Sequence, residues 1–244
     1  MRNGVLQYSL TKRAAAEAVG TAFLLAGTVG SGIMAQHLSS GNTAIALLAN
    51  TIATGGVLAA IILTFGPISG AHFNPAVTLS DALERGLPWR EVPVYVAAQI
   101  TGAVSGVAIA DTMFGLPALF ASHHARHGFP LLLSEFVATF GLLTVIWGCV
   151  RFRTAAIPYA VTAYIMGAYW FTASTSFANP AVTIARSLSD TFAGIAPQDA
   201  GGFILVELLG ALSATLFFAW LAPRLEESAP ELLLPHGETW SKHA

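Results

Sequence analysis

A five-residue string, Asn-Pro-Ala-Val-Thr, occurs twice in the chain, at residues 74–78 and 179–183. Asn is a strong helix N-cap, and Pro is tolerated at the first helical position because its missing N–H would have no partner there. Each copy therefore predicts the start of a short helix. A helix start presents unpaired N–H groups and a partial positive charge of roughly half a unit. Such an end attracts hydrogen-bond acceptors and repels cations.

The elements that must position these two starts are long apolar stretches. Six of them reach the roughly 20 residues that a membrane span needs. They cover residues 12–35, 43–66, 91–113, 131–151, 155–173 and 201–222. The two segments that begin with the repeated string are too short to span. Half-length helices at membrane depth are tolerated only when they are buried in protein or line a water-filled cavity.

The composition is that of a membrane protein. The 244 residues are 55% hydrophobic and 10% charged, whereas a soluble domain carries roughly 25% charged residues. A net charge of −2 and the lack of a basic patch give no indication of nucleic-acid binding. The single cysteine excludes an intrachain disulfide. No phosphate-binding loop and no convincing nucleophile–base pair stand in the sequence, so we expect neither an enzyme nor a cofactor.

The Lys and Arg residues predict the orientation, because cytoplasmic loops carry an excess of them. With the N-terminus inside, nine of the 11 lie on the cytoplasmic side and two, Arg126 and Arg186, on the outer side. We therefore expect both termini in the cytoplasm. Residues 1–222 are predicted to form one transmembrane domain, and residues 223–244 a cytoplasmic tail.

The two halves of the chain, about 11–113 and 130–222, resemble each other beyond the repeated string. The sequence around Glu17 echoes that around Glu135. Each half holds three predicted spans, an odd number, so the halves enter the membrane from opposite sides. Such an inverted repeat has its functional site near the midplane, where the halves meet. The two helix starts then face one space, and a pore through it suits water or a polyol and disfavours cations.

The sequence resembles the aquaporin and aquaglyceroporin (major intrinsic protein) family over roughly residues 11–222. The resemblance rests on the run from Ser69 to Thr78, the second Asn179-Pro180-Ala181, the two glutamates, and Gln99 followed by Gly102. It implies an all-α membrane fold with six transmembrane helices and two re-entrant half-helices. It also implies a homotetramer in the lipid bilayer, here the bacterial inner membrane, with one pore in each subunit.

The resemblance also assigns roles to individual residues. The pore motifs are Asn74, Pro75 and Ala76 in the first half and Asn179, Pro180 and Ala181 in the second. Backbone carbonyls line the pore at Gly70, Ala71, His72, Thr175, Ser176 and Phe177, and the loops that carry them are held by Glu17 and Glu135. A selectivity filter, carried over by spacing, comprises Thr54, Gly167, Ser176 and Val182.

This filter departs from the family pattern at Val182. Water and glycerol channels of the family have Arg there and at least one aromatic residue elsewhere in the ring. Four small residues predict a wider filter, and the missing guanidinium removes five donors and a fixed charge. The Arg-less pattern resembles a bacterial aquaglyceroporin-like group linked to arsenic resistance. It implies passage of polyols or neutral trivalent metalloids such as As(OH)3. A water-selective aquaporin, an ion-coupled secondary transporter and a non-conducting scaffold remain alternatives.

Two further features have more than one interpretation. Arg186 lies one helical turn after Val182, and because helical side chains tilt toward the N-terminus, it can reach back over the outer mouth. Alternatively, it forms an ion pair in the vestibule. His123, His124 and His127 lie in the loop that joins the halves, and three histidines at this spacing can bind a metal. Because that loop holds no carboxylate or Cys, we favour a solvated loop and expect no metal site.

Overall fold

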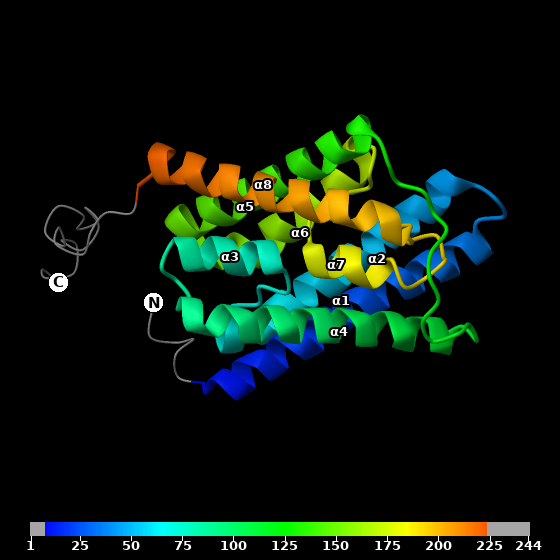
Figure 1. Ribbon diagram of the computed structural model, residues 1–244, viewed down its shortest axis with the longest axis horizontal. Helices are drawn as coiled ribbons and strands as arrows, with labels where there is room; N and C mark the ends of the chain where they lie inside the picture. Colours follow the sequence, from blue (N-terminus) through cyan, green and yellow to red (C-terminus); the bar gives the residue numbers. More distant parts are fainter. Residues whose placement is uncertain (1–7, 224–244) are drawn as a thin grey trace, which may run out of the picture.

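The computed structural model describes residues 8–223, and within this range the chain folds into helices and loops without strands. The elements are α1 (Leu10–Leu38), α2 (Thr43–Ser69), α3 (Pro75–Leu83), η2 (Trp89–Glu91), α4 (Val92–Met113), α5 (Phe129–Phe152), η3 (Thr154–Ala156), α6 (Ile157–Phe171), α7 (Pro180–Arg186) and α8 (Pro197–Leu221). They form one elongated bundle, with the short α3 and α7 in its middle (Figure 1). The predicted tail lies outside the described residues, apart from Pro223.

Every predicted span becomes a helix, but one is shorter than expected. Helices α1, α2, α5 and α8, and η2 together with α4, are long and apolar enough to cross a membrane. Helix α6 has only 15 residues, and the three-residue η3 directly precedes it. The helix ends at Phe171 because residues 172–178 leave it to form the approach to α7. The end of the fifth predicted span is therefore a loop and not a helix.

The two halves use the same helix packing. Helix α1 packs against α4 and α2, and α5 packs against α8 and α6. Glycines allow the closest crossings: a Cβ on Gly102 would collide with the carbonyl of Ala18, and one on Gly210 would lie 2.6 Å from the carbonyl oxygen of Phe136. Small residues at helix crossings are the usual means of close packing between membrane helices. The equivalent contacts agree with the inverted repeat.

The two copies of the repeated string start helices, as predicted. Asn74 caps α3 by accepting a hydrogen bond from the backbone N–H of Ala76 at 2.9 Å. Asn179 caps α7 in the same way, accepting from Ala181 at 3.0 Å. Helices α3 and α7 lie nearly end to end, with their starts meeting in the middle of the bundle (Figure 1).

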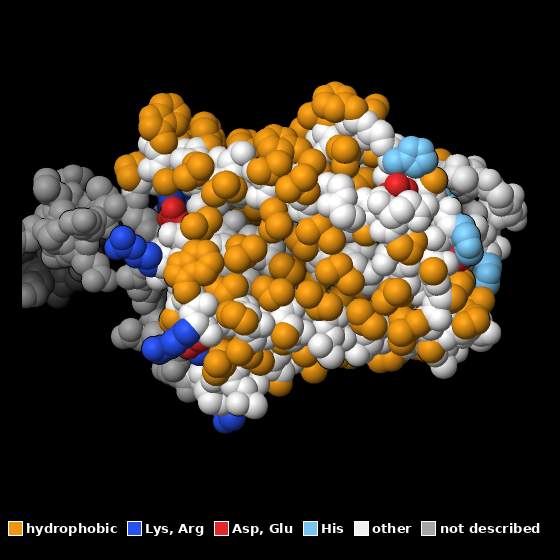
Figure 2. Space-filling view, viewed as in Figure 1, with side chains coloured by type: hydrophobic (Ala, Val, Ile, Leu, Met, Phe, Trp, Pro, Cys, Tyr) orange, Lys and Arg blue, Asp and Glu red, His pale blue; other side chains and the backbone are white. Residues whose placement is uncertain are grey.

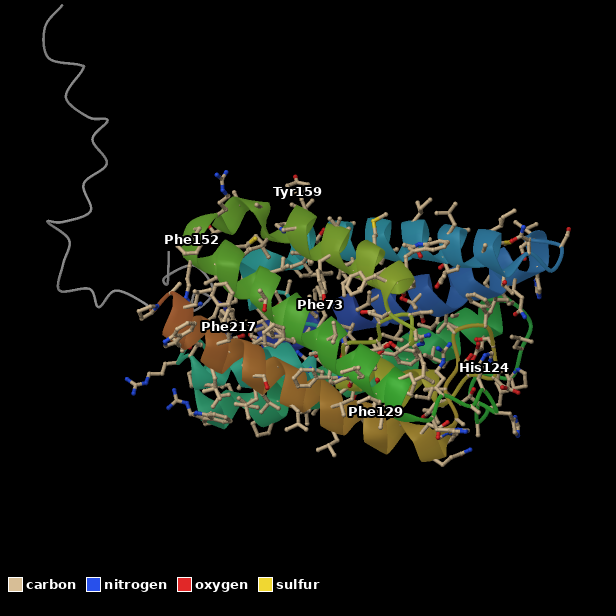
Figure 3. The ribbon with its side chains drawn as sticks, turned by 90° about the horizontal axis from the view of Figure 1, so that it is seen from above. Phe73, His124, Phe129, Phe152, Tyr159 and Phe217 are labelled. Carbon is tan, nitrogen blue, oxygen red and sulfur yellow. The ribbon has the colours of Figure 1, made fainter. Side chains whose placement is uncertain are left out.

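The surface divides into an apolar middle and two polar ends. The start of α1 and the end of α8 lie at one end, called here the terminal end (Figure 1). The 114–128 connection lies at the opposite end, called here the loop end, where His124 is labelled in Figure 3. On the face shown in Figure 2, hydrophobic side chains cover the middle, Lys and Arg lie at the terminal end, and His lies at the loop end. This pattern fits a chain whose middle is solvated by lipid.

Candidate functional site

A cavity of about 180 Å³ passes both helix starts and has two unlike walls. The polar wall comes from the loops before α3 and α7, and its residues are Gly70, Ala71, His72, Asn74, Ser176 and Asn179. The opposite wall is aliphatic and includes Leu58, Ile62, Leu142, Ile146, Val161 and Ile165. Such a lining offers hydrogen-bonding groups on one side and apolar contacts on the other.

The two asparagines hold the loops to each other at the centre of the cavity. The Asn74 side-chain amide donates to the carbonyl of Ala178 at 2.7 Å, and the Asn179 amide donates to the carbonyl of Phe73 at 2.8 Å. Figure 3 shows Phe73 in the middle of the bundle. A carboxamide has two N–H donors, so each Asn keeps one for the cavity. Both side chains are buried yet line the cavity, which makes them the central donors of the site.

The loop backbone is held in a conformation that L-residues rarely adopt. Positive φ angles occur in both loops, at Ala71 (51°), Phe73 (49°), Thr175 (65°), Ser176 (52°) and Ala178 (49°). Each such residue costs of order 1–3 kcal/mol unless the surroundings hold it in place. The matching positions in the two loops show that the halves repeat this backbone geometry as well as the sequence.

Glu17 holds the first loop from behind. Its carboxylate accepts hydrogen bonds from the backbone N–H groups of His72 at 3.0 Å and Phe73 at 2.7 Å. It also accepts from the hydroxyl of Ser69 at 2.6 Å and the side-chain amide of Gln99 at 2.8 Å. Four donors thus satisfy one fully buried carboxylate. This is the position that the resemblance implies for Glu17.

Glu135 holds the second loop with fewer donors. It accepts from the backbone N–H groups of Phe177 at 2.9 Å and Ala178 at 2.7 Å. Where the first half has Gln99, the second has Glu207, which accepts from the hydroxyl of Thr183 at 2.7 Å. The second carboxylate oxygen of Glu207 is buried without a hydrogen-bond partner among the described residues. The two supports are therefore equivalent in place but not in chemistry.

The predicted filter residues do not all reach the cavity. Thr54, Ser176 and Val182 line it, but Gly167 does not. Gly167 is exposed on the opposite side of α6, and Tyr169 lines the cavity instead, with its hydroxyl 3.5 Å from that of Thr54. Of the four residues carried over by spacing, Gly167 is thus the one that does not line the cavity. The four-residue spacing of Val161, Ile165 and Tyr169 along α6 is the signal that identifies the facing side chain.

The remaining predicted residues lie close to the cavity or on it. Phe177 and Arg186 line it, whereas Thr175 does not. Pro75, Ala76, Pro180 and Ala181 are buried at the helix starts and do not line it. Asp81, which the repeat makes the first-half counterpart of Arg186, also lines the cavity, seven residues after Asn74. Its carboxylate lies 3.7 Å from Nε2 of His72.

The loop-end histidines lie next to carboxylates that come from outside their own loop. His123 contacts Asp190 through its ring at 3.0 Å and through its backbone N–H at 2.8 Å. The ring of His127 lies 3.6 Å from Asp199. The sequence interpretation considered only the loop, which holds no carboxylate, and folding brings two carboxylates to it from other segments. Each His has a different Asp, and within residues 8–223 no three potential ligands are grouped to hold a metal.

Comparisons with known proteins agree with this architecture. The family described as major intrinsic protein matches residues 5–171. The chain is 50% identical over 229 residues to aquaglyceroporin AqpS of Rhizobium meliloti (strain 1021), covering 92% of this chain and 98% of that relative. It is 31% identical over 229 residues to aquaporin NIP2-2 of Zea mays, covering 91% and 74%. The X-ray structure of the aquaglyceroporin from Plasmodium falciparum has the same fold, with a TM-score of 0.61, 20% identity, and 89% and 97% of the two chains covered.

Proposed function

The chain belongs to the major intrinsic protein family, whose members are passive channels and not enzymes, and we propose that it passes polyols and neutral trivalent metalloid hydroxides. Family members conduct water and small solutes such as glycerol. The proposal for this chain is a pore whose filter comprises Thr54, Tyr169, Ser176 and Val182. The As(OH)3 molecule is uncharged at neutral pH, polyol-like in shape, and bulkier than water.

One observation carries this proposal: the cavity-lining residue three positions after Asn179 is Val182 and not Arg. A valine occupies less space than an arginine and donates no hydrogen bond. The cavity therefore selects less by hydrogen bonding at this point and more by the fit of hydroxyls to one wall and carbon to the other. Tyr169 adds an aromatic ring to the lining of the same cavity, where four small residues were expected, and this ring favours solutes with a carbon backbone.

The proposed assembly is a homotetramer of one channel domain, residues 1–222, in the bacterial inner membrane. The apolar middle of the molecule supports insertion into a bilayer (Figure 2). Large apolar side chains such as Phe23 and Leu216 are exposed there and need lipid or a second subunit as a neighbour. The excess of Lys and Arg supports both termini in the cytoplasm. The terminal end is then cytoplasmic and the loop end is outside.

Stopped-flow measurements on proteoliposomes test the function. We expect permeability to glycerol and As(OH)3 well above that of empty vesicles, rising linearly with solute concentration and independent of a pH gradient. Water flux without glycerol or As(OH)3 flux would favour the water-selective alternative. Saturation together with dependence on a proton gradient would favour the coupled transporter. No flux of any solute would leave the scaffold alternative and would contradict the proposal.

A further inference from the structure

Arg186 is a charged side chain that lines the same cavity as Val182. It is the last residue of α7, one helical turn beyond Val182, and only 3% of it is exposed. The guanidinium carbon lies 3.4 Å from the centre of the Phe177 ring. Its Nε donates to the carbonyl of Ala193. Two contacts thus fix the side chain, and the residue lines the cavity.

A second guanidinium approaches the same aromatic ring from the connection between the halves. The Arg126 guanidinium carbon lies 5.1 Å from the centre of the Phe177 ring. Its Nε donates to the carbonyl of Gly194 at 2.7 Å, and its Nη1 donates to that of Ser174 at 3.0 Å. The fold therefore places two guanidinium groups, from residues 60 positions apart in the sequence (126 and 186), next to the ring of Phe177.

Within the part of the chain that the structure describes, neither guanidinium forms an ion pair with a carboxylate. The ion pairs found there involve Arg13, Arg151 and histidines, but neither Arg126 nor Arg186. The buried acids of the second half, Glu135 and Glu207, accept hydrogen bonds from backbone N–H groups and from the Thr183 hydroxyl and not from either guanidinium. Of the two, Arg186 lines the cavity, where electrostatic interactions are stronger than in bulk water.

We propose that Arg186, supported by Arg126, is the fixed positive charge that excludes cations and protons from this pore. It stands one turn farther from the helix start than the Arg that the family pattern places at position 182. Charge exclusion and size selection are then separated: Arg186 repels cations at the loop end, while the filter at Val182 stays wide. This inference rests on the proposed function, because it presupposes a passive pore for uncharged solutes.

The test is the proton and Na⁺ leak of proteoliposomes under an imposed membrane potential, measured beside glycerol permeability. Arg186→Gln is expected to raise both leaks at least about tenfold with glycerol permeability retained, because the pore loses a fixed positive charge. Arg186→Lys keeps the charge and is expected to stay near the wild-type leak. Arg153→Gln, an exposed change at the terminal end, is the matched control for the loss of a surface Arg.

Two further variants keep the proposal falsifiable. If Arg186→Gln does not fold, Arg126→Gln removes the second cation and is expected to raise the leak several-fold. The double variant Val182→Arg with Arg186→Gln returns a cation to the family position and is expected to restore a low leak. An unchanged leak in Arg186→Gln, with glycerol flux intact, overturns the inference alone. A wild-type chain that passes no glycerol overturns the proposed function instead.

Discussion

Each half of the pore has an aromatic ring and a charged side chain at equivalent positions. The charged side chain is an acid in the first half and a cation in the second. In the first half His72 stands two residues before Asn74, and Asp81 seven residues after it, 3.7 Å from the imidazole. In the second half the equivalent residues are Phe177 and Arg186, in contact at 3.4 Å. The inverted repeat turns the first pair toward the terminal end and the second toward the loop end.

The inverted repeat thus determines where a side chain meets the pore. The residue type at that position then determines the charge that the side chain brings. Both loops have positive φ angles at matching positions, both are held by a buried glutamate, and both place a ring against the cavity. On this shared backbone geometry, the first half places an acid at its end of the cavity, and the second half places a cation at the other end. These two ends are called here the mouths. Mutations can separate the support that the two loops share from the unlike charges at the two mouths.

The largest expected effect comes from replacing the buried glutamates. In Glu17→Gln an NH2 group replaces one carboxylate oxygen, and this group faces two donors instead of accepting from them. Each buried donor that loses its acceptor is expected to lower the free energy of unfolding by about 1–3 kcal/mol. Glu17 satisfies four donors and Glu135 two backbone donors. Thermal unfolding in detergent should therefore show a larger loss of Tm for Glu17→Gln than for Glu135→Gln.

The control for that comparison is Asn50→Ala, since the Asn50 amide bonds α1 at the carbonyl of Thr28 and does not hold either loop. It is expected to lower Tm while glycerol permeability persists. Both glutamate variants are expected to lose permeability together with Tm. Equal losses of Tm in the two glutamate variants would contradict the claim that the supports differ.

A smaller effect is expected from making the two supports alike. In Glu207→Gln the side chain gains a donor, as Gln99 has for Glu17. The variant changes a pair of neighbouring buried acids into an acid and an amide. We therefore expect the free energy of unfolding to rise by about 1 kcal/mol and Tm by roughly 2–4 °C. The reverse exchange, Gln99→Glu, should lower Tm. A loss of stability in Glu207→Gln would show that the second half needs its acid.

The smallest effect is expected at the loop end. Hydrogen bonds from the backbone and ring of His123 hold the pKa of Asp190 below its usual range. A lowered pKa in the folded state gives stability that is present above the unfolded pKa of about 3.9 and lost as pH falls through the folded pKa. Asp190→Asn should therefore lower Tm slightly at pH 6, by at most about 2 °C, and not at pH 2. An equal Tm difference at both pH values would contradict this.

Much of the fold and part of the site follow from the sequence. The apolar lengths and the doubled Asn-Pro start predict the spans and the short helices, because each depends on local residue types. The α6 side chain that lines the cavity does not follow from its distance to Asn179, because packing sets the side of the helix that faces the cavity. The partners of His123 and the approach of Arg126 to Phe177 also needed the structure, since both join segments that lie far apart in the sequence.

The most direct test of the account is the ratio of glycerol to water permeability in Val182→Arg, compared with the wild type and with Val182→Ile. A long donor side chain at this position narrows the pore, so we expect the ratio to fall by about tenfold or more while water still passes. The isoleucine control adds a single methylene without charge and should change the ratio much less. An unchanged ratio in Val182→Arg would contradict the claim that this position sets the width of the pore.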